Sequence, residues 1–439
     1  MNSDCMLFKY GIHSISSMGV PNDETLHAIR HESKRKTLIE NIIFLSVMIK
    51  ALKVRLYPNE QQKILLEKHF GSCRFVYNYF LEVRTKYYAE SKAQGKAQGL
   101  NYFKTCEMLT KLKKEKKYSW LYEVSNPSLQ WSLRKLDNAF TAFFRKNANY
   151  PNFRSKKDNQ YFIIPAGFKA DADKLVIPKF KEGIKYRDKK VIPSGIKQVV
   201  ITKEIERYYA SIHYETDEKP SKGDGIIGID LGIKHFLTLS DGLQVEPLNI
   251  ARKMEKKLRR EHRRLSRKKK GSENRKKQIV KLEKVYQYIR DRRTDFNHKV
   301  STAIAKHYGT VVIEDLNIRG MTQNHHIAKS ITDQGWYQFK QMLQYKLQWR
   351  NANLIEIGRF DPSSKMCSRC GNIKHGLKLS DRVYHCDVCG LTMDRDLNAA
   401  VNIRNIGLIK VGKGIPEFTP VESATTAELS KGGLRLATL

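Results

Sequence analysis

Residues 225–234 read Gly-Ile-Ile-Gly-Ile-Asp-Leu-Gly-Ile-Lys, an apolar run that ends in a carboxylate between glycines. A buried strand that ends in an acid is costly unless the acid has a partner or a chemical task. Residues 236–242 continue into a second apolar run, and residues 309–316 again lead an apolar run into an acid. These stretches predict a sheet whose strand ends carry Asp230 and Glu314.

A third acidic segment, Met-Asp-Arg-Asp-Leu-Asn-Ala-Ala at residues 393–400, opens an Ala-rich run that favours a helix. Asp230, Glu314 and either Asp394 or Asp396 can therefore converge on a pair of divalent cations. One cation of such a pair activates water and the other stabilises the leaving oxygen, and hard Mg²⁺ prefers carboxylate oxygens. Taken singly, each acid also fits a structural role: a strand-end cap, a salt bridge or a helix N-cap.

Two Cys-x-x-Cys pairs, each followed by a glycine, lie fifteen residues apart near the C-terminal end: Cys367, Cys370, Cys386 and Cys389. Two such pairs complete a tetrahedral shell for zinc, and four protein ligands leave no open position, so we predict a structural ion. Four reduced, buried cysteines are the alternative, and His375 and His385 fit ordinary polar roles. Cys5, Cys73 and Cys106 have no recurring spacing, which argues against disulfides and fits a reducing cytosol.

The charge of the chain points to a polyanionic partner. Its 81 Lys and Arg residues exceed its 45 Asp and Glu residues, for a formal net charge of +36. Such an excess repels itself in a compact fold unless a polyanion neutralises it, so nucleic acid is the expected partner, ahead of a solvated basic surface or a lipid surface. Because no stretch approaches the roughly 20 apolar residues of a membrane span, we expect a cytoplasmic, nucleoid-associated protein.

The N-terminal part of the chain divides into three patterns. Residues 1–47 lack periodicity, and we interpret them as an upstream extension before a native start at Met48. Residues 49–57 alternate as a strand, and Asn59 with Gln62 then predicts a capped helix. Helical spacing continues to about residue 147, with one apolar face: Leu133, Leu136, Phe140, Phe143 and Phe144. We expect a helical bundle with an aromatic core and a basic outer face.

Between residues 150 and 215 the sequence predicts four short strands, at 161–164, 174–177, 198–202 and 208–214. The strand at residues 49–57 can join them in one β domain into which the helices are inserted. A polar linker at residues 219–225 precedes the next domain. Residues 252–293 are dominated by Arg and Lys and break at Gly271, which predicts a long helical hairpin. Its thin apolar stripe consists of Leu258, Leu265, Ile279, Leu282, Val285, Tyr286 and Ile289.

The order of these motifs resembles the TnpB family of transposon-encoded, RNA-guided DNA endonucleases. The resemblance covers about residues 48–422 and rests on Ile229-Asp230-Leu231-Gly232, Ile313-Glu314-Asp315-Leu316, the four cysteines and the run from Asp394 to Ala400. It also includes Lys50 to Pro58, Ser363-Ser364-Lys365 and Pro416 to Glu422. The resemblance implies that Asp230, Glu314 and Asp396 are the ligands of a catalytic Mg²⁺ site with two ions. Asp394 is the alternative third ligand.

The resemblance further implies a multidomain α+β and α/β architecture. Its expected parts are a β-barrel wedge domain (48–59 and 148–220), an inserted helical recognition domain (60–147), an RNase H-like RuvC nuclease core (221–360 and 391–411), a basic hairpin (252–308), a zinc module (361–390) and a flexible tail (412–439).

The function implied by the resemblance is cleavage of double-stranded DNA, guided by an RNA from the protein's own locus, next to a short adjacent motif. Base pairing would supply most of the specificity. Tyr77, Tyr79 and Phe80 are candidates to contact bases near the motif, although core packing explains them better. A regulator of transposition without relevant cleavage and an unguided resolvase-like enzyme are the alternatives. An intact set of three acids favours an active nuclease.

Overall fold

A computed structural model describes most of the chain and separates it into two compact units. It covers residues 48–171, 173–187, 192–193, 195–217, 220–378 and 380–412. The expectations for residues 1–47 and for nearly all of the tail lie outside the described residues. The first unit comprises Met1–Thr202 and Tyr208–Asp217, and the second comprises Lys203–Arg207 and Glu218–Leu439.

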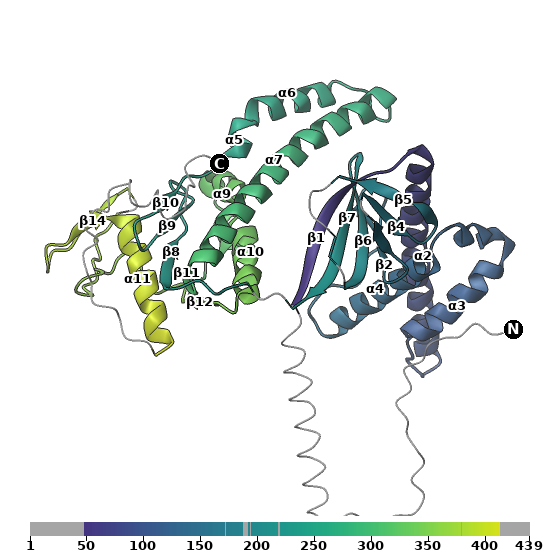
Figure 1. Ribbon diagram of the computed structural model, residues 1–439, viewed down its shortest axis with the longest axis horizontal. Coiled ribbons are helices and arrows are strands. Elements are labelled where there is room, and N and C mark those ends of the chain that lie inside the picture. The colour runs from purple at the N-terminus through teal and green to yellow at the C-terminus, as the bar shows by residue number, and fades with distance from the viewer. Residues whose placement is uncertain are drawn as a thin grey trace, which may run out of the picture. The chain divides into compact units, whose positions relative to one another are not determined.

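The first unit contains a seven-stranded sheet of order β2-β6-β7-β1-β5-β4-β3. Its strands are β1 (Met48–Tyr57), β2 (Gln160–Ile164), β3 (Lys169–Asp171), β4 (Lys174–Ile177), β5 (Phe180–Tyr186), β6 (Ile196–Glu204) and β7 (Arg207–Thr216). β1 lies at the centre and pairs antiparallel with β7 from Met48 opposite Thr216 to Leu56 opposite Tyr208 (Figure 1). The predicted joining of the first strand to strands more than 100 residues later is therefore confirmed.

The helices inserted after β1 are α2 (Glu60–Ala93), α3 (Tyr102–Lys114), the 3₁₀ helix η1 (Lys116–Glu123) and α4 (Asn126–Phe144). The predicted cap of α2 is confirmed, because Gln62 N donates to Asn59 Oδ1 at 2.8 Å and Asn59 N donates to Gln62 Oε1 at 3.1 Å. Tyr77 and Phe80 are buried in the core of this unit, as their packing interpretation predicts.

The predicted apolar face of α4 is partly wrong. Leu133, Leu136 and Phe140 are buried, but Phe144 is 70% exposed. Phe144 is the last residue of the helix, where its ring packs on Phe140 and Phe143 instead of entering the core.

The second unit contains a five-stranded sheet of order β10-β9-β8-β11-β12. Its strands are β8 (Ile226–Asp230), β9 (Leu237–Leu239), β10 (Gln244–Val245), β11 (Thr310–Glu314) and β12 (Asn353–Ile357). β8, β11 and β12 run parallel, whereas β9 runs antiparallel to β8. Its helices are α5 (Ile250–Lys253), α6 (Glu255–Ser266), α7 (Glu273–His307), α8 (Ile318–Met321), α9 (His325–Gln334), α10 (Trp336–Trp349) and α11 (Arg395–Lys410).

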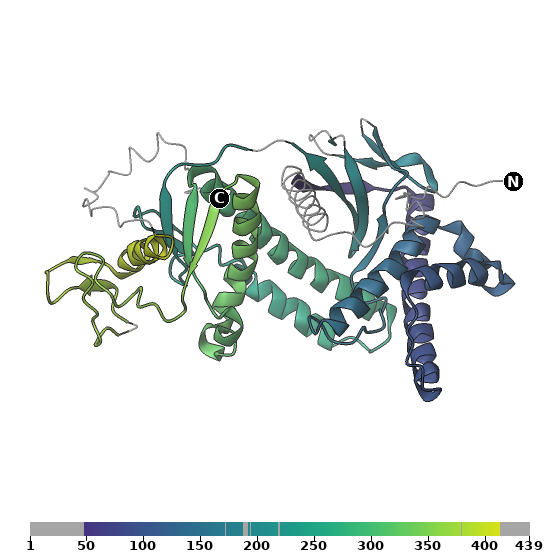
Figure 2. The ribbon, with the colours of Figure 1, turned by 90° about the horizontal axis from the view of Figure 1, so that it is seen from below.

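Helices cover both faces of this sheet (Figures 1 and 2). Ile229 and Ile313 face a core that includes residues of α7 and α10. Val312 points the other way and packs with Ile403 of α11. This alternation fixes which strand residues face α11, because successive side chains of a strand point to opposite faces.

The basic hairpin forms as predicted but buries fewer residues. α6 and α7 are separated at Gly271, and Ser272 caps α7 by accepting a 3.2 Å hydrogen bond from Arg275 N. Leu282, Val285 and Ile289 are buried, whereas Ile279 and Tyr286 are 37% and 47% exposed. Tyr286 nevertheless contacts α6 through a 2.8 Å hydrogen bond between its hydroxyl and His262 Nε2. Among the described helices, none is long and apolar enough to cross a membrane.

Candidate active site and metal centre

Two carboxylates emerge together from the parallel strands. Val312 lies opposite Gly228 in the register of β11 and β8. Two residues further along, each strand ends in an acid, Glu314 on β11 and Asp230 on β8. Because side chains alternate, Asp230 lies on the same face as Gly228, and Glu314 on the same face as Val312. That face is covered by α11. Because β8 and β11 are parallel neighbours, their ends bring the two acids to the same edge of the sheet.

α11 brings the third carboxylate to this edge. A Cβ at Gly228 would collide with the backbone of α11 at Ala400 and Arg404, so the helix lies directly on β8. Asp396 precedes Ala400 by one helical turn and interacts electrostatically with Asp230. The structure therefore brings Glu314, Asp396 and Asp394 close to Asp230.

Asp394 and Asp396 have different surroundings. Asp394 is the N-cap of α11, and its Oδ1 accepts hydrogen bonds from Asp396 N at 2.9 Å and Leu397 N at 3.1 Å. One carboxylate oxygen of Asp394 is thus engaged in ending the strand and starting the helix. Asp396 lies in the first turn of α11, and within the described part of the chain its carboxylate accepts no hydrogen bond. The two acids therefore differ in how many of their carboxylate oxygens are already hydrogen-bonded.

The group is electrostatically strained as a set of bare acids. Burial raises the pKa of Asp230 to about 8, with further contributions from the neighbouring Glu314 and Asp396. Burial also raises the pKa of Glu314, against the opposing effect of its hydrogen bond from Ser363. For Asp230 the neighbouring carboxylates thus add to the effect of burial, as expected where acids lie close together. Divalent cations with oxygen preference match this donor set.

Ser363 is a site residue that sequence reasoning did not single out. Its Oγ donates a hydrogen bond to Glu314 Oε1, and its carbonyl oxygen accepts a 2.7 Å hydrogen bond from Asn402 of α11. Ser363 thereby connects the carboxylate on β11 to the helix that carries Asp396. The sequence places Ser363 in the run before the first cysteine pair but contains no signal that joins it to residue 314.

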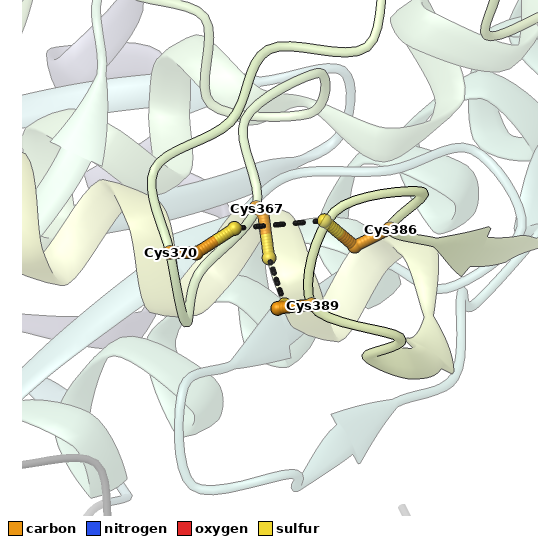
Figure 3. A group of neighbouring side chains, drawn as sticks. All are labelled: Cys367, Cys370, Cys386 and Cys389. Atoms are coloured by element: carbon orange, nitrogen blue, oxygen red, sulfur yellow. Dashed lines mark hydrogen bonds between the residues drawn. The ribbon is translucent and has the colours of Figure 1, made fainter.

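The four cysteines form the group that their spacing predicts. One Sγ from each residue lies within 4.8 Å of all the others (Figure 3). The Sγ atoms of Cys367 and Cys389 are 3.6 Å apart, as are those of Cys370 and Cys386. Such a closed set of four sulfurs is able to hold a metal ion.

The two cysteine pairs have the same backbone geometry. Gly371 N donates to Cys367 O at 2.9 Å, and Gly390 N donates to Cys386 O at 3.0 Å. Both glycines have positive φ, +77° and +70°, where side chains are disfavoured. Hydrogen bonding from the backbone N–H of Cys389 lowers the pKa of Cys386 to about 6, which favours the thiolate that binds metal.

The cysteine module is joined to the start of α11. Its two-stranded sheet, β13 (Val383–His385) with β14 (Thr392–Asp394), pairs Val383 with Asp394. Asn398 of α11 donates to Met366 O at 2.8 Å and accepts from Ser368 N at 3.0 Å. The module thus contacts α11 immediately before and after Asp396.

Three family models match this chain. The model OrfB_IS605, described as a probable transposase, matches residues 209–325, and a Cas12f1-like TNB domain matches residues 336–403. A helix-turn-helix domain model matches residues 48–93, where this structure has strand β1 and the continuous helix α2.

Curated relatives match over most of their length. A protein of Streptomyces pristinaespiralis named as an RNA-guided DNA endonuclease is 36% identical over 365 residues, 82% of this chain and 89% of that protein. InsQ of Escherichia coli K12, named in the same way, is 31% identical over 401 residues, 86% of this chain and 98% of that protein. The relatives define the class as RNA-guided DNA endonucleases. Within that class, the chain belongs to the TnpB family.

A solved structure shares the fold. The protein in a cryo-EM structure titled as a Cas12f1–sgRNA–target DNA complex matches with a TM-score of 0.52 and 13% identity, over 82% of this chain and 99% of that one. At this identity the match concerns the fold alone.

Proposed function

We propose that this protein is a transposon-encoded, RNA-guided and Mg²⁺-dependent DNA endonuclease that cuts target DNA beside a short adjacent motif. The observation that carries the proposal is the convergence of Asp230, Glu314 and Asp396 in a chain of the TnpB family. Burial, with the neighbouring carboxylates, raises the pKa of Asp230, and a pair of divalent cations would supply positive charge that stabilises its ionised form.

Asp230, Glu314 and Asp396 would hold Mg²⁺, most simply as two ions. When bound, Mg²⁺ would activate the attacking water and stabilise the leaving oxygen. The chain's own contribution is positioning. β8 and β11 fix two carboxylates at one sheet edge, α11 brings the third, and Ser363 orients Glu314. Asp394 maintains the helix start that places Asp396.

The units take the roles expected for the family. We assign residues 221–360 and 391–411 to a RuvC-like nuclease core, residues 48–59 with 148–220 to a wedge domain and residues 60–147 to a recognition domain. A parallel sheet with helices on both faces supports the first assignment. The joined strands with an inserted helical segment support the other two.

The four cysteines would hold a structural zinc ion in residues 361–390. Four sulfur ligands leave no position open for substrate, so the ion would not take part in the reaction. Its place beside α11 supports a role in positioning the helix that carries Asp396.

Guide RNA and target DNA are the proposed partners. The net charge of +36 and the Arg- and Lys-rich α6 and α7 suit contacts to phosphate backbones. Such contacts position nucleic acid without reading its sequence, so base pairing with the guide would supply the specificity.

Sequencing the RNA that co-purifies with the protein tests this proposal. The expected RNA comes from the locus that encodes the protein and carries a segment that can be matched to a DNA target. Purification without bound RNA, combined with cutting that ignores DNA sequence, would identify an unguided nuclease. Bound nucleic acid without Mg²⁺-dependent cutting would identify a regulator.

A further inference from the structure

The turn after β12 presents an aromatic ring to solvent. Phe360 is 93% exposed, the highest value among the large hydrophobic residues of the described ranges. Burying a phenylalanine side chain is worth roughly 1.5–3 kcal/mol, which this ring leaves unused in the free protein. An unpartnered ring of this kind is informative when its position and neighbours identify what it would contact.

The turn that carries Phe360 is held in place. Gly358 N donates to Asp361 Oδ2 at 2.6 Å, and Asp361 N donates to Gly358 O at 3.1 Å. Arg359 donates to Asp315 Oδ2 at 2.9 Å, and Lys410 of α11 lies 3.3 Å from Asp361 Oδ2. These contacts join the turn to the end of β11 and to α11, so the ring is presented from a fixed support.

The same turn borders the proposed active site on both sides. Ile357, three residues before Phe360, lies opposite Glu314 in the register of β12 and β11. Ser363, three residues after it, donates its hydrogen bond to Glu314. Since consecutive Cα atoms are 3.8 Å apart, the Cα of Phe360 is at most about 11 Å from either Cα. Phe360 therefore lies midway along the turn that joins two residues adjoining Glu314.

The neighbours of the ring indicate the chemistry of its partner. Arg359 and Lys410 are exposed by 45% and 44%, so charged side chains interrupt the apolar surface around Phe360. A protein partner or a lipid surface would require a continuous apolar patch. An isolated ring beside the exposed Arg359 and Lys410, each paired with an aspartate in the free protein, suits single-stranded nucleic acid, whose bases stack on aromatic faces while phosphates contact cations.

We propose that Phe360 stacks on an unpaired base of the DNA strand being cut, a few nucleotides from the scissile phosphate, and holds that strand against the carboxylates. This inference rests on the proposed function. The DNA strand is the assigned partner because the turn that carries the ring also carries Ser363, which contacts Glu314, and DNA is the substrate of these carboxylates in the proposed function.

The test combines cleavage kinetics with a fluorescent base. Phe360→Ala is compared with Phe360→Trp and with Tyr337→Ala, which removes a 63% exposed aromatic side chain from α10, on the sheet face away from α11. Phe360→Ala is expected to lower DNA cleavage by roughly 5- to 100-fold, the equivalent of one lost stacking contact, with Phe360→Trp restoring most of the loss and Tyr337→Ala cutting as wild type.

For the second readout, 2-aminopurine is placed at successive positions of the cut strand, and separately in the guide RNA, with an Asp230→Ala background preventing cleavage. Stacking predicts quenching at one or two DNA positions near the cut that disappears in Phe360→Ala. Wild-type cleavage by Phe360→Ala, or Phe360-dependent quenching only in the RNA, would overturn the inference. If the wild-type protein cuts no RNA-matched DNA, the proposed function fails, while the quenching experiment still reports whether the ring stacks.

Discussion

Asp230 is subject to opposite demands from folding and from chemistry. Its position at the end of β8 buries the carboxyl and places it beside Glu314 and Asp396, which raises its pKa to about 8. Because the folded state retains a proton that the unfolded chain releases near pH 4, the folded state binds more protons between about pH 4 and 8. The stability of the metal-free protein should therefore fall as the pH rises through this window.

Replacing Asp230 by Asn removes the free-energy cost of ionising a buried carboxyl group. In the absence of divalent metal, Asp230→Asn should increase the free energy of unfolding at pH 7.5 by on the order of 2 kcal/mol and flatten its dependence on pH. The same variant should lose DNA cleavage and retain nucleic-acid binding. Urea unfolding between pH 5 and 9 measures the first effect, and a pH profile parallel to that of the wild type would contradict it.

Ser363 gives a second prediction at the level of single residues. Ser363→Ala should reduce cleavage roughly 10-fold and raise the Mg²⁺ concentration for half-maximal rate, because Glu314 loses the hydroxyl that orients it. Ser363→Thr should restore part of the loss, since it retains the hydroxyl. Ser364→Ala is the matched control at the next position, and an equal effect in the control would argue against a specific role for Ser363.

The sequence predicts some of these residues and not others for a physical reason. Asp230 and Glu314 are visible because each ends an apolar run, and that pattern is local to the strand. The choice between Asp394 and Asp396 depends on which oxygen accepts the helix N–H groups, and the contact of Ser363 with Glu314 spans 49 residues. The spacing of residues along the sequence indicates neither the choice between the two aspartates nor the contact of Ser363.

At the scale of elements, the cysteine module acts on α11. Removing the proposed zinc ion, by chelation followed by restored Mg²⁺ or by Cys386→Ser, should reduce cleavage at least roughly 10-fold because Asn398 and β14 would no longer fix the start of the helix. Cys106→Ser, which alters a cysteine of the first unit, should cut as wild type. Cleavage assays with saturating Mg²⁺ test this, and full activity without zinc would refute the positioning role.

Gly71 gives a prediction about helix α2. It lies within the helix, and a Cβ at this position would have no atom within 4 Å. Gly71→Ala should therefore increase the free energy of unfolding of the first unit by about 1 kcal/mol.

Gly228 is the matched contrast, since an added Cβ there meets the backbone of α11, and Gly228→Ala should be strongly destabilising. Urea unfolding measures both variants. A destabilised Gly71→Ala protein would show that the helix does not tolerate a side chain at this position.

Long elements with end signals were predictable, as were the short strands β2 and β4, but some other short strands were not. The capping pair Asn59 and Gln62 and the break at Gly271 located α2 and the basic hairpin. β3 and β5 were not predicted: β3 has three residues, and β5 interrupts its apolar positions with Lys, Glu and a glycine at φ +71°. Such strands form because neighbouring strands pair with them.

For the whole molecule, the net charge of +36 calls for a partner of opposite charge. A polyanion neutralises this charge, and carboxylates at one sheet edge need divalent cations before they act on phosphate. Guide RNA, target DNA and Mg²⁺ supply both in the proposed function. The charge could be read from composition, but the grouping of the carboxylates depends on pairing between strands more than 80 residues apart.

In the proposed function, RNA directs this protein to cut DNA with the carboxylates of Asp230, Glu314 and Asp396. The most direct measurement incubates the purified protein and its bound RNA with DNA complementary to the variable part of that RNA, with Mg²⁺, beside unmatched DNA and the Asp230→Asn variant. We expect the wild-type protein to cut the matched DNA alone, and the Asp230→Asn variant to cut neither DNA. Equal cutting of both DNAs, or cutting by Asp230→Asn, would contradict it.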